Sequence, residues 1–141
     1  MRVPNAAELL MEEHRAIRRM LVGLVEDGYD RETVARLVHD VGVHTDAEER
    51  FLYPAVVDAI PDCRALAERS SGEHRELRDA VAQLETDDAD EFARRGALVR
   101  AVFELHVRTE EAELLPRCQE EFGEVRMLEL GRELDAFRDA H

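Results

Sequence analysis

The sequence repeats one pattern of histidine and glutamate residues in its two halves. The pattern begins with Glu-His-Arg, continues with His-x-x-x-Glu-Glu, and places a proline six residues after the first glutamate of that second motif. Four imidazoles and two carboxylates suit a pair of bridged metal ions, so the fold has to bring these side chains together. The copies, 60 to 62 residues apart, are Glu13-His14-Arg15, His44 to Glu49 and Pro54, then Glu73-His74-Arg75, His106 to Glu111 and Pro116.

Hydrophobic residues recur with helical periodicity over nearly all of the 141 residues. Asn5 is a favourable N-cap with Glu8 as its capping-box partner, and helix breakers fall at 28–30, 60–62 and 86–90. Long helices joined by short turns become antiparallel neighbours. We therefore predict an all-α, up-down-up-down four-helix bundle over residues 1–122. Residues 123–141 are predicted to form a short C-terminal amphipathic helix that packs on the bundle or on a partner.

The spacing of the four histidines from the turns places them at one level of this bundle. His14 precedes Gly28 by 14 residues and His44 follows Asp30 by 14, so both stand roughly 21 Å from that turn at ~1.5 Å per residue. The same count from the turn at 86–90 puts the other two histidines at nearly the same height. Side chains four residues apart share a helical face, so the glutamates of both His-x-x-x-Glu motifs point to the same axis.

A metal site and a metal-free core are the alternative interpretations of these residues. A single histidine on an apolar helical face is more often a hydrogen-bonded core residue than a ligand. Glu48 and Glu110 also lie on apolar faces, however, where an unpaired carboxylate is costly to bury. Six ligand-type residues at one level therefore favour a metal site, and the mixed set suits iron, with manganese or zinc as substitutes.

This pattern resembles the hemerythrin-like HHE cation-binding domain over nearly the whole chain, from residue 8 to about residue 120. The resemblance implies a four-helix bundle that holds a non-haem, oxo- or hydroxo-bridged centre of two Fe ions. It also implies the division of the ligands: His14 and His44 serve one iron, His74 and His106 serve the other, and Glu48 and Glu110 bridge the two.

The sequence departs from the oxygen-carrying hemerythrins at one position. Those proteins have a further histidine four residues after the third-helix histidine, and Arg78 stands there in this chain. One iron then lacks an imidazole, which disfavours simple reversible oxygen carriage. Tyr53 is a candidate for the vacant position, as are water and an exogenous molecule. An ideal helix turns Tyr53 ~140° away from Glu48, so a tyrosine packed at the bundle wall is the alternative.

The remaining glutamates of the repeated pattern are predicted to support the histidines. Each adjoins a ligand candidate in the sequence. Ligating histidines commonly donate their second N–H to a carboxylate or a carbonyl. We therefore expect these glutamates either to accept hydrogen bonds from groups that surround the metal ligands or to pair with cations. They are Glu13, Glu49, Glu73 and Glu111.

Composition excludes several classes of function. The net charge of −14 argues against binding to nucleic acid or to an anionic membrane surface, because both require a basic patch. No apolar stretch approaches the ~20 residues of a membrane span, and no signal peptide is evident, so we expect a cytoplasmic protein. Cys63 and Cys118 are most simply free thiols in that compartment.

We therefore expect a di-iron protein that binds or reacts with a small oxidant: oxygen, peroxide or nitric oxide. Peroxide decomposition is one such activity. The alternative is an oxygen or iron sensor, or an iron-handling protein, that acts through a partner without catalysis, so enzyme, carrier and sensor remain open. The expected binding partner is a small diatomic molecule or peroxide, and a homodimer is an assembly that the sequence allows.

Overall fold

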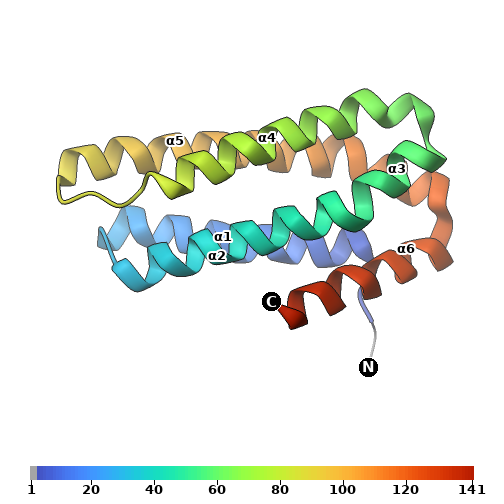
Figure 1. Cartoon of the computed structure of the whole chain (residues 1–141), viewed down its shortest axis with the longest axis horizontal. Coiled ribbons are helices and arrows are strands. Elements are labelled where there is room, and N and C mark those ends of the chain that lie inside the picture. The colour runs from blue at the N-terminus through green and yellow to red at the C-terminus, as the bar shows by residue number, and fades with distance from the viewer. Residues whose placement is uncertain (1–2) are drawn as a thin grey trace.

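The structure, a computed structural model, describes residues 3–141 and contains only helices and turns within that range. The all-α prediction is confirmed, and four long helices dominate the molecule (Figure 1). The elements are α1 (Ala6–Asp27), α2 (Arg31–Ala47), the π-helical turn η1 (Glu48–Leu52), α3 (Tyr53–Ala59), the short 3-10 turn η2 (Pro61–Cys63), α4 (Arg64–Ala82), α5 (Ala89–Arg108), the π-helical turn η3 (Thr109–Leu114) and α6 (Leu115–Ala140).

Local sequence signals explain where these helices begin and end. Asn5 caps α1 through the predicted capping box with Glu8, and Gly28 ends that helix with φ of 85°, a conformation that favours glycine. Asp30 and Asp88 accept backbone N–H bonds in the first turns of α2 and α5. The turns therefore lie where the breakers in the sequence predict them, which fixes the height of each histidine.

The long helices enclose a four-sided bundle. Figure 1 shows α1 and α2 in one layer and α4 and α5 in the other. Contacts join α1 to α2, α2 to α4, α4 to α5 and α5 back to α1, so each helix has two neighbours. Inward side chains from all four helices therefore converge on the axis.

The hydrophobic core is divided into two clusters. One cluster joins the start of α1 with η1, α3 and α6, and includes Leu10, Leu52 and Leu130. The other fills the end of the bundle near the α1–α2 and α4–α5 turns, and includes Leu37 and Phe103. The histidine and glutamate side chains of the repeated pattern are buried alongside both clusters.

Helix α6 continues past the four-sided bundle and packs on α1. Gly123 interrupts its helical geometry with φ of 76°, at the position where the sequence places the boundary of the last segment. Further along, Gly131 lies so close to the start of α1 that a Cβ atom there would be 2.6 Å from the carbonyl oxygen of Pro4. The absence of a side chain at Gly131 thus permits the close approach.

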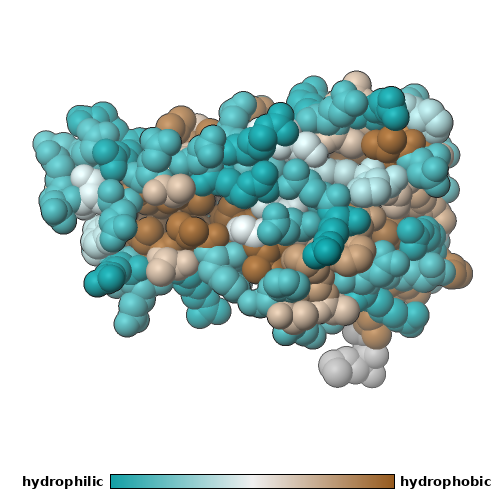
Figure 2. Space-filling model, viewed as in Figure 1, coloured by the Kyte–Doolittle hydropathy of each residue, from teal (hydrophilic) through white to brown (hydrophobic). Residues whose placement is uncertain are grey.

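The surface seen in Figure 2 is mostly hydrophilic, and hydrophobic side chains show in patches between the helices. Among the described residues, no helix is both long and apolar enough to cross a membrane. Cys63 and Cys118 are both buried free thiols, as predicted.

Candidate metal centre

Each of the six predicted ligands comes from a different part of the helical frame, and all are buried. The histidines lie on α1, α2, α4 and α5, and the two glutamates lie in the π turns that continue α2 and α5. His44 is 3% exposed, and 0% is found for His14, Glu48, His74, His106 and Glu110.

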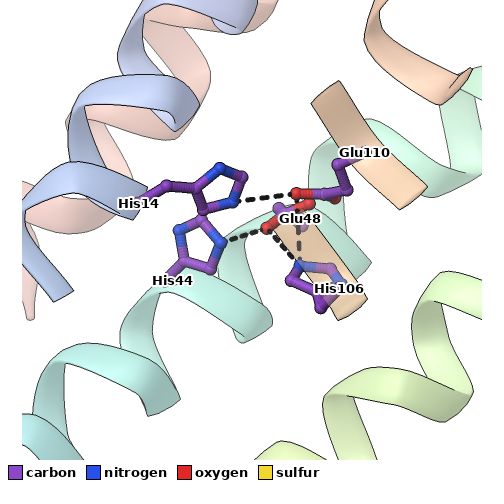
Figure 3. Close-up of side chains that lie close together, drawn as sticks. All are labelled: His14, His44, Glu48, His106 and Glu110. Atoms are coloured by element: carbon purple, nitrogen blue, oxygen red, sulfur yellow. Dashed lines mark ion pairs between the residues drawn. The ribbon is translucent and has the colours of Figure 1, made fainter. Parts of the chain in front are cut away.

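Five of these side chains converge on one point (Figure 3). One nitrogen or oxygen atom from each of the five lies within 4.8 Å of the others. His44 Nε2 is 2.5 Å from Glu48 Oε1, while Glu110 Oε1 lies 3.1 Å from His14 Nε2 and 3.2 Å from the fifth side chain, His106, at its Nε2. Such a set of buried nitrogen and oxygen atoms is the donor set of a mixed-ligand metal site.

His74 lies beside this group. Its Nε2 atom is 3.1 Å from His106 Nε2 and 3.7 Å from Glu48 Oε1. The rings of His74 and His106 have centroids 4.4 Å apart, and those of His14 and His44 are 4.9 Å apart. The four imidazoles therefore form two pairs on either side of the two carboxylates.

Several buried polar atoms in the centre have no hydrogen-bond partner among the described residues. They are close to one another, but not in hydrogen-bonding geometry. An unsatisfied buried polar atom costs about 1–3 kcal/mol, so a cluster of them needs a compensating interaction. A cation at their meeting point would satisfy the whole cluster, which supports a fit between this site and metal. The atoms are His14 Nε2, His44 Nε2, Glu48 Oε1 and Glu110 Oε1.

Tyr53 also reaches the centre. Its hydroxyl donates to Glu110 Oε2 at 2.7 Å and lies 3.0 Å both from Glu48 Oε2 and from His74 Nε2. The ring stacks on His74 at 5.3 Å between centroids. The alternative prediction, a tyrosine at the bundle wall, is therefore not what the structure has, and the ideal-helix angle is wrong here.

The π turn η1 is the reason for this placement of Tyr53. The backbone N–H of Tyr53 donates to the carbonyl of Glu48, five residues earlier, where an α-helix would use the residue four earlier. The wider turn brings residue i+5 over residue i. Pro54 has no N–H to donate to the carbonyl four residues before it, which favours such a local rearrangement.

The second ring nitrogen, Nδ1, of each of the four candidate ligand histidines faces a carboxylate. Since a carboxylate only accepts, each Nδ1 carries a proton, and Nε2 is the nitrogen that faces the centre. The predicted role of the four adjacent glutamates is confirmed, and each glutamate serves a histidine on a neighbouring helix. The distances are 2.7 Å for His14–Glu111, 2.7 Å for His44–Glu13, 3.4 Å for His74–Glu49 and 3.4 Å for His106–Glu73.

Burial and charge give the centre unusual proton affinities. Burial lowers the pKa of His14. Burial also acts to lower the pKa of His44, but the charge of Glu48 and the hydrogen bond with Glu13 raise it to about 10. Although burial opposes it, the adjacent histidines hold the pKa of Glu48 well below its usual range. Without metal, His44 and Glu48 thus form a buried imidazolium–carboxylate pair, and a metal ion would replace the proton.

Arg78 does not enter the centre. Its Nη1 atom donates to Thr45 Oγ1 at 3.0 Å and to Glu49 Oε2 at 2.8 Å. Sequence reasoning did not find the donors behind the glutamates, namely Thr109 on Glu73 and Arg138, whose Nη1 is 3.5 Å from Glu13. These contacts join distant parts of the chain, and no local spacing signals them.

Comparison with protein families identifies a match over most of the chain. Residues 5–118 match the family model described as the Hemerythrin HHE cation binding domain. The match covers most of the chain and spans all six predicted ligands and Tyr53. Comparisons with curated proteins and with solved structures give no significant match.

Proposed function

We propose, from the premise that the chain belongs to the hemerythrin family of HHE cation-binding domains, that it holds two iron ions and binds or reacts with a small oxidant. The observation that carries this proposal is the set of five buried ligand atoms within 4.8 Å of one another. Four of the buried polar atoms there have no hydrogen-bond partner in the described chain. We also propose that the four long helices alternate in direction, in an up-down-up-down bundle.

The two imidazole pairs indicate how the ligands divide. His14 and His44 would hold one ion, and His74 and His106 would hold the other. Glu48 and Glu110 lie between the pairs, and each has an oxygen within 4 Å of histidines from both. Carboxylates shared between two ions are a known use of a helical bundle core, which supports the bridging role of both glutamates.

Tyr53 completes the proposed ligand set. Its oxygen is 3.0 Å from His74 Nε2, so it stands on the side of the His74 and His106 pair. That side is the one where Arg78 replaces the further histidine of the oxygen carriers. Burial raises the pKa of Tyr53 well above its usual range, so the hydroxyl keeps its proton when no metal is present and donates it to a carboxylate.

Bound iron would supply one-electron redox chemistry and a position for a small oxidant. The residues of the chain prepare for this chemistry. The glutamates around the histidines fix the ring tautomers, so that Nε2 is unprotonated toward the centre. The two hydrophobic clusters keep bulk water from the carboxylates. Tyr53 places one hydroxyl proton beside both bridging candidates.

Metal analysis with an absorption spectrum tests the proposal. Protein loaded anaerobically with ferrous iron and then exposed to air should contain two iron ions per chain, and His106→Ala or Glu48→Ala should lose them. A chain that holds one ion or none after iron loading would contradict the proposal.

Peroxide consumption distinguishes an enzyme from a carrier or sensor. If the centre reacts with peroxide, the iron-loaded protein should consume many equivalents per chain, and Glu110→Ala should not. Freely reversible oxygen binding without peroxide turnover would favour carriage. Neither behaviour, in a protein that retains two iron ions, would favour sensing or iron handling through a partner.

A further inference from the structure

The carboxylates behind the four histidines are not equivalent in the two halves of the centre. His14 and His44 each have a carboxylate oxygen 2.7 Å from Nδ1. For His74 and His106 the corresponding distance is 3.4 Å. The first two hydrogen bonds are short and strong, and the other two are at the limit of the interaction. The repeat in the sequence allows the cause to be located, because each residue in and beside the repeated motifs has a counterpart in the other half.

The first cause is a difference between two equivalent arginines. Arg18 follows His14 by four residues, as Arg78 follows His74. Arg18 donates to Glu104 through two nitrogens, at 2.8 and 3.1 Å, and thus leaves Glu111 to His14. Arg78 instead donates to Glu49, at 2.8 Å, through the same oxygen that faces His74.

A single position explains why the two arginines differ. Glu104 lies two residues before His106, and the residue two before His44 is Gly42. Gly42 has no side chain to attract Arg78. Arg78 therefore turns to Thr45 and Glu49, which lie one and two turns further along the same helical face.

The second cause is a hydroxyl in the second half, at a position where the first half has none. Thr109 donates to Glu73 Oε2 at 2.9 Å, and Glu73 is the carboxylate that faces His106. The counterpart of Thr109 in the first half is Ala47, which is buried and has no donor side chain. Glu13 is thus free of such a competitor, and its contact with Arg138 is longer, at 3.5 Å.

We propose that the position pairs Gly42/Glu104 and Ala47/Thr109 make the two halves of the metal centre unequal. They determine how strongly the supporting carboxylates polarise the histidine rings. A carboxylate that accepts a strong bond from Nδ1–H makes the imidazole a better electron donor to a metal. His14 and His44 are therefore the stronger donors, and His74 and His106 the weaker. Arg78 and Thr109 act as positioning residues through Glu49 and Glu73. This inference rests on the proposed metal centre.

The test uses zinc, which is diamagnetic, and measures the Nδ1–H proton resonances of the four histidines by NMR. A stronger hydrogen bond moves such a resonance downfield. In the zinc-loaded protein, His14 and His44 should lie downfield of His74 and His106. Gly42→Glu should draw Arg78 away and move His74 downfield, and a Cβ at this glycine meets no atom within 4 Å. Glu104→Gln should release Arg18 and move His14 upfield.

The hydroxyl is tested independently of the arginines. Thr109→Ala should move the His106 resonance downfield, whereas Thr109→Ser keeps the donor and should leave it in place. Gly42→Gln adds a side chain of the same size without the charge and controls for the general effect of replacing glycine in a helix. The rate of zinc loss to a chelator gives a second readout, with a change of roughly 10-fold expected for Glu104→Gln.

The outcomes separate this inference from the proposed function. Four coincident resonances, or resonances that do not respond to Gly42→Glu and Thr109→Ala, would overturn the inequality while zinc remains bound. A protein that binds no zinc would overturn the metal centre itself. Resonances that move in the controls as far as in the charged or hydroxyl-deleting variants would also contradict the assigned causes.

Discussion

The two π turns of the molecule have the same backbone and different consequences. In η1 the N–H of Tyr53 donates to the carbonyl of Glu48, and in η3 the N–H of Leu115 donates to the carbonyl of Glu110. A proline follows each turn at the next residue. The hydroxyl of Tyr53 reaches both carboxylates of the centre, whereas Leu115, the first residue of α6, packs in the hydrophobic core. The difference between the halves thus lies in the side chains, because the backbone device is duplicated.

This comparison shows how a symmetric frame produces an asymmetric site. Each π turn rotates the residue five positions after its glutamate toward the bundle axis. In the first half that residue carries an oxygen, and in the second it carries only carbon. A ligand or proton donor for the centre therefore arrives from one side, next to His74.

Removal of metal should have the largest effect on stability, because the glutamates of both π turns would lose the ion that they bind. At a free metal concentration 100 times the dissociation constant, binding stabilises the fold by about 2.7 kcal/mol. The loaded protein should therefore melt several degrees above chelator-treated protein in thermal unfolding followed by circular dichroism. Glu110→Ala should abolish the difference. Identical melting curves with and without metal would mean that the turns do not serve a metal centre.

The next largest effect is expected when the second turn is made to resemble the first. Leu115→Tyr should destabilise the protein by about 1–3 kcal/mol, because the added ring overfills a packed site and buries a hydroxyl. Denaturant unfolding measures this change. Leu115→Met conserves the volume and should cost less than about 1.5 kcal/mol. A Leu115→Tyr protein as stable as the parent would show that the second turn has room for a tyrosine side chain.

Proton competition should distinguish the two histidines of the first half. Burial lowers the pKa of His14, so this ring is neutral at pH 7, whereas the pKa of His44 is raised to about 10. Metal must displace the His44 proton at any pH below that value. The metal affinity should thus rise as pH rises toward 10, by about 1.36 kcal/mol per unit for one proton. Competition with a zinc chelator at pH 6.5, 7.5 and 8.5, referred to the chelator's own pH dependence, would detect this. A flat profile would contradict it.

The smallest change in stability is expected for Tyr53→Phe in the metal-loaded protein, a substitution that makes the first turn apolar like the second. The loss of a hydroxyl that bonds to carboxylates should cost about 1–3 kcal/mol in the metal-free protein and less with metal bound. If Tyr53 is a ligand, the ferric protein should lose a visible phenolate-to-iron absorption band while both ions remain. An unchanged spectrum would leave Tyr53 as a hydrogen-bond donor only.

Helical periodicity and turn positions suffice to predict that the six candidate ligands lie at one level of the bundle. His14, His44 and Glu48 needed only the counts of 14 and four residues that α-helical geometry converts into height and direction. Ideal-helix geometry turns Tyr53 away from the centre, because an ideal helix lacks the extra residue of the π turn that changes the direction of the side chains after it. Tyr53 was nevertheless a candidate ligand, and the adjacent Pro54, which can distort a helix, was the signal for it.

The supporting layer was predictable only in part. The glutamates that adjoin the candidate ligands were expected to accept hydrogen bonds from groups around the centre or to pair with cations. In the structure they accept hydrogen bonds from histidines on neighbouring helices. Which histidine each one holds depends on the order of the helices around the bundle, and that order is a tertiary property. The roles of Gly42 and Glu104 are visible only as a difference between equivalent positions, once the contacts of Arg18 and Arg78 are known.

The pairing of glutamates with histidines also bears on how such a chain could have arisen. Glu13 serves His44 within the first half, but Glu49 serves His74 and Glu111 serves His14, across the junction of the two repeats. A single repeat would leave one of its histidines unsupported and one glutamate unused. Two copies related by a twofold axis would complete each other in both respects. The four glutamate–histidine hydrogen bonds are thus the arrangement that a homodimeric ancestor of half this length would have required. Fusion of the two genes would then have allowed each half to change independently.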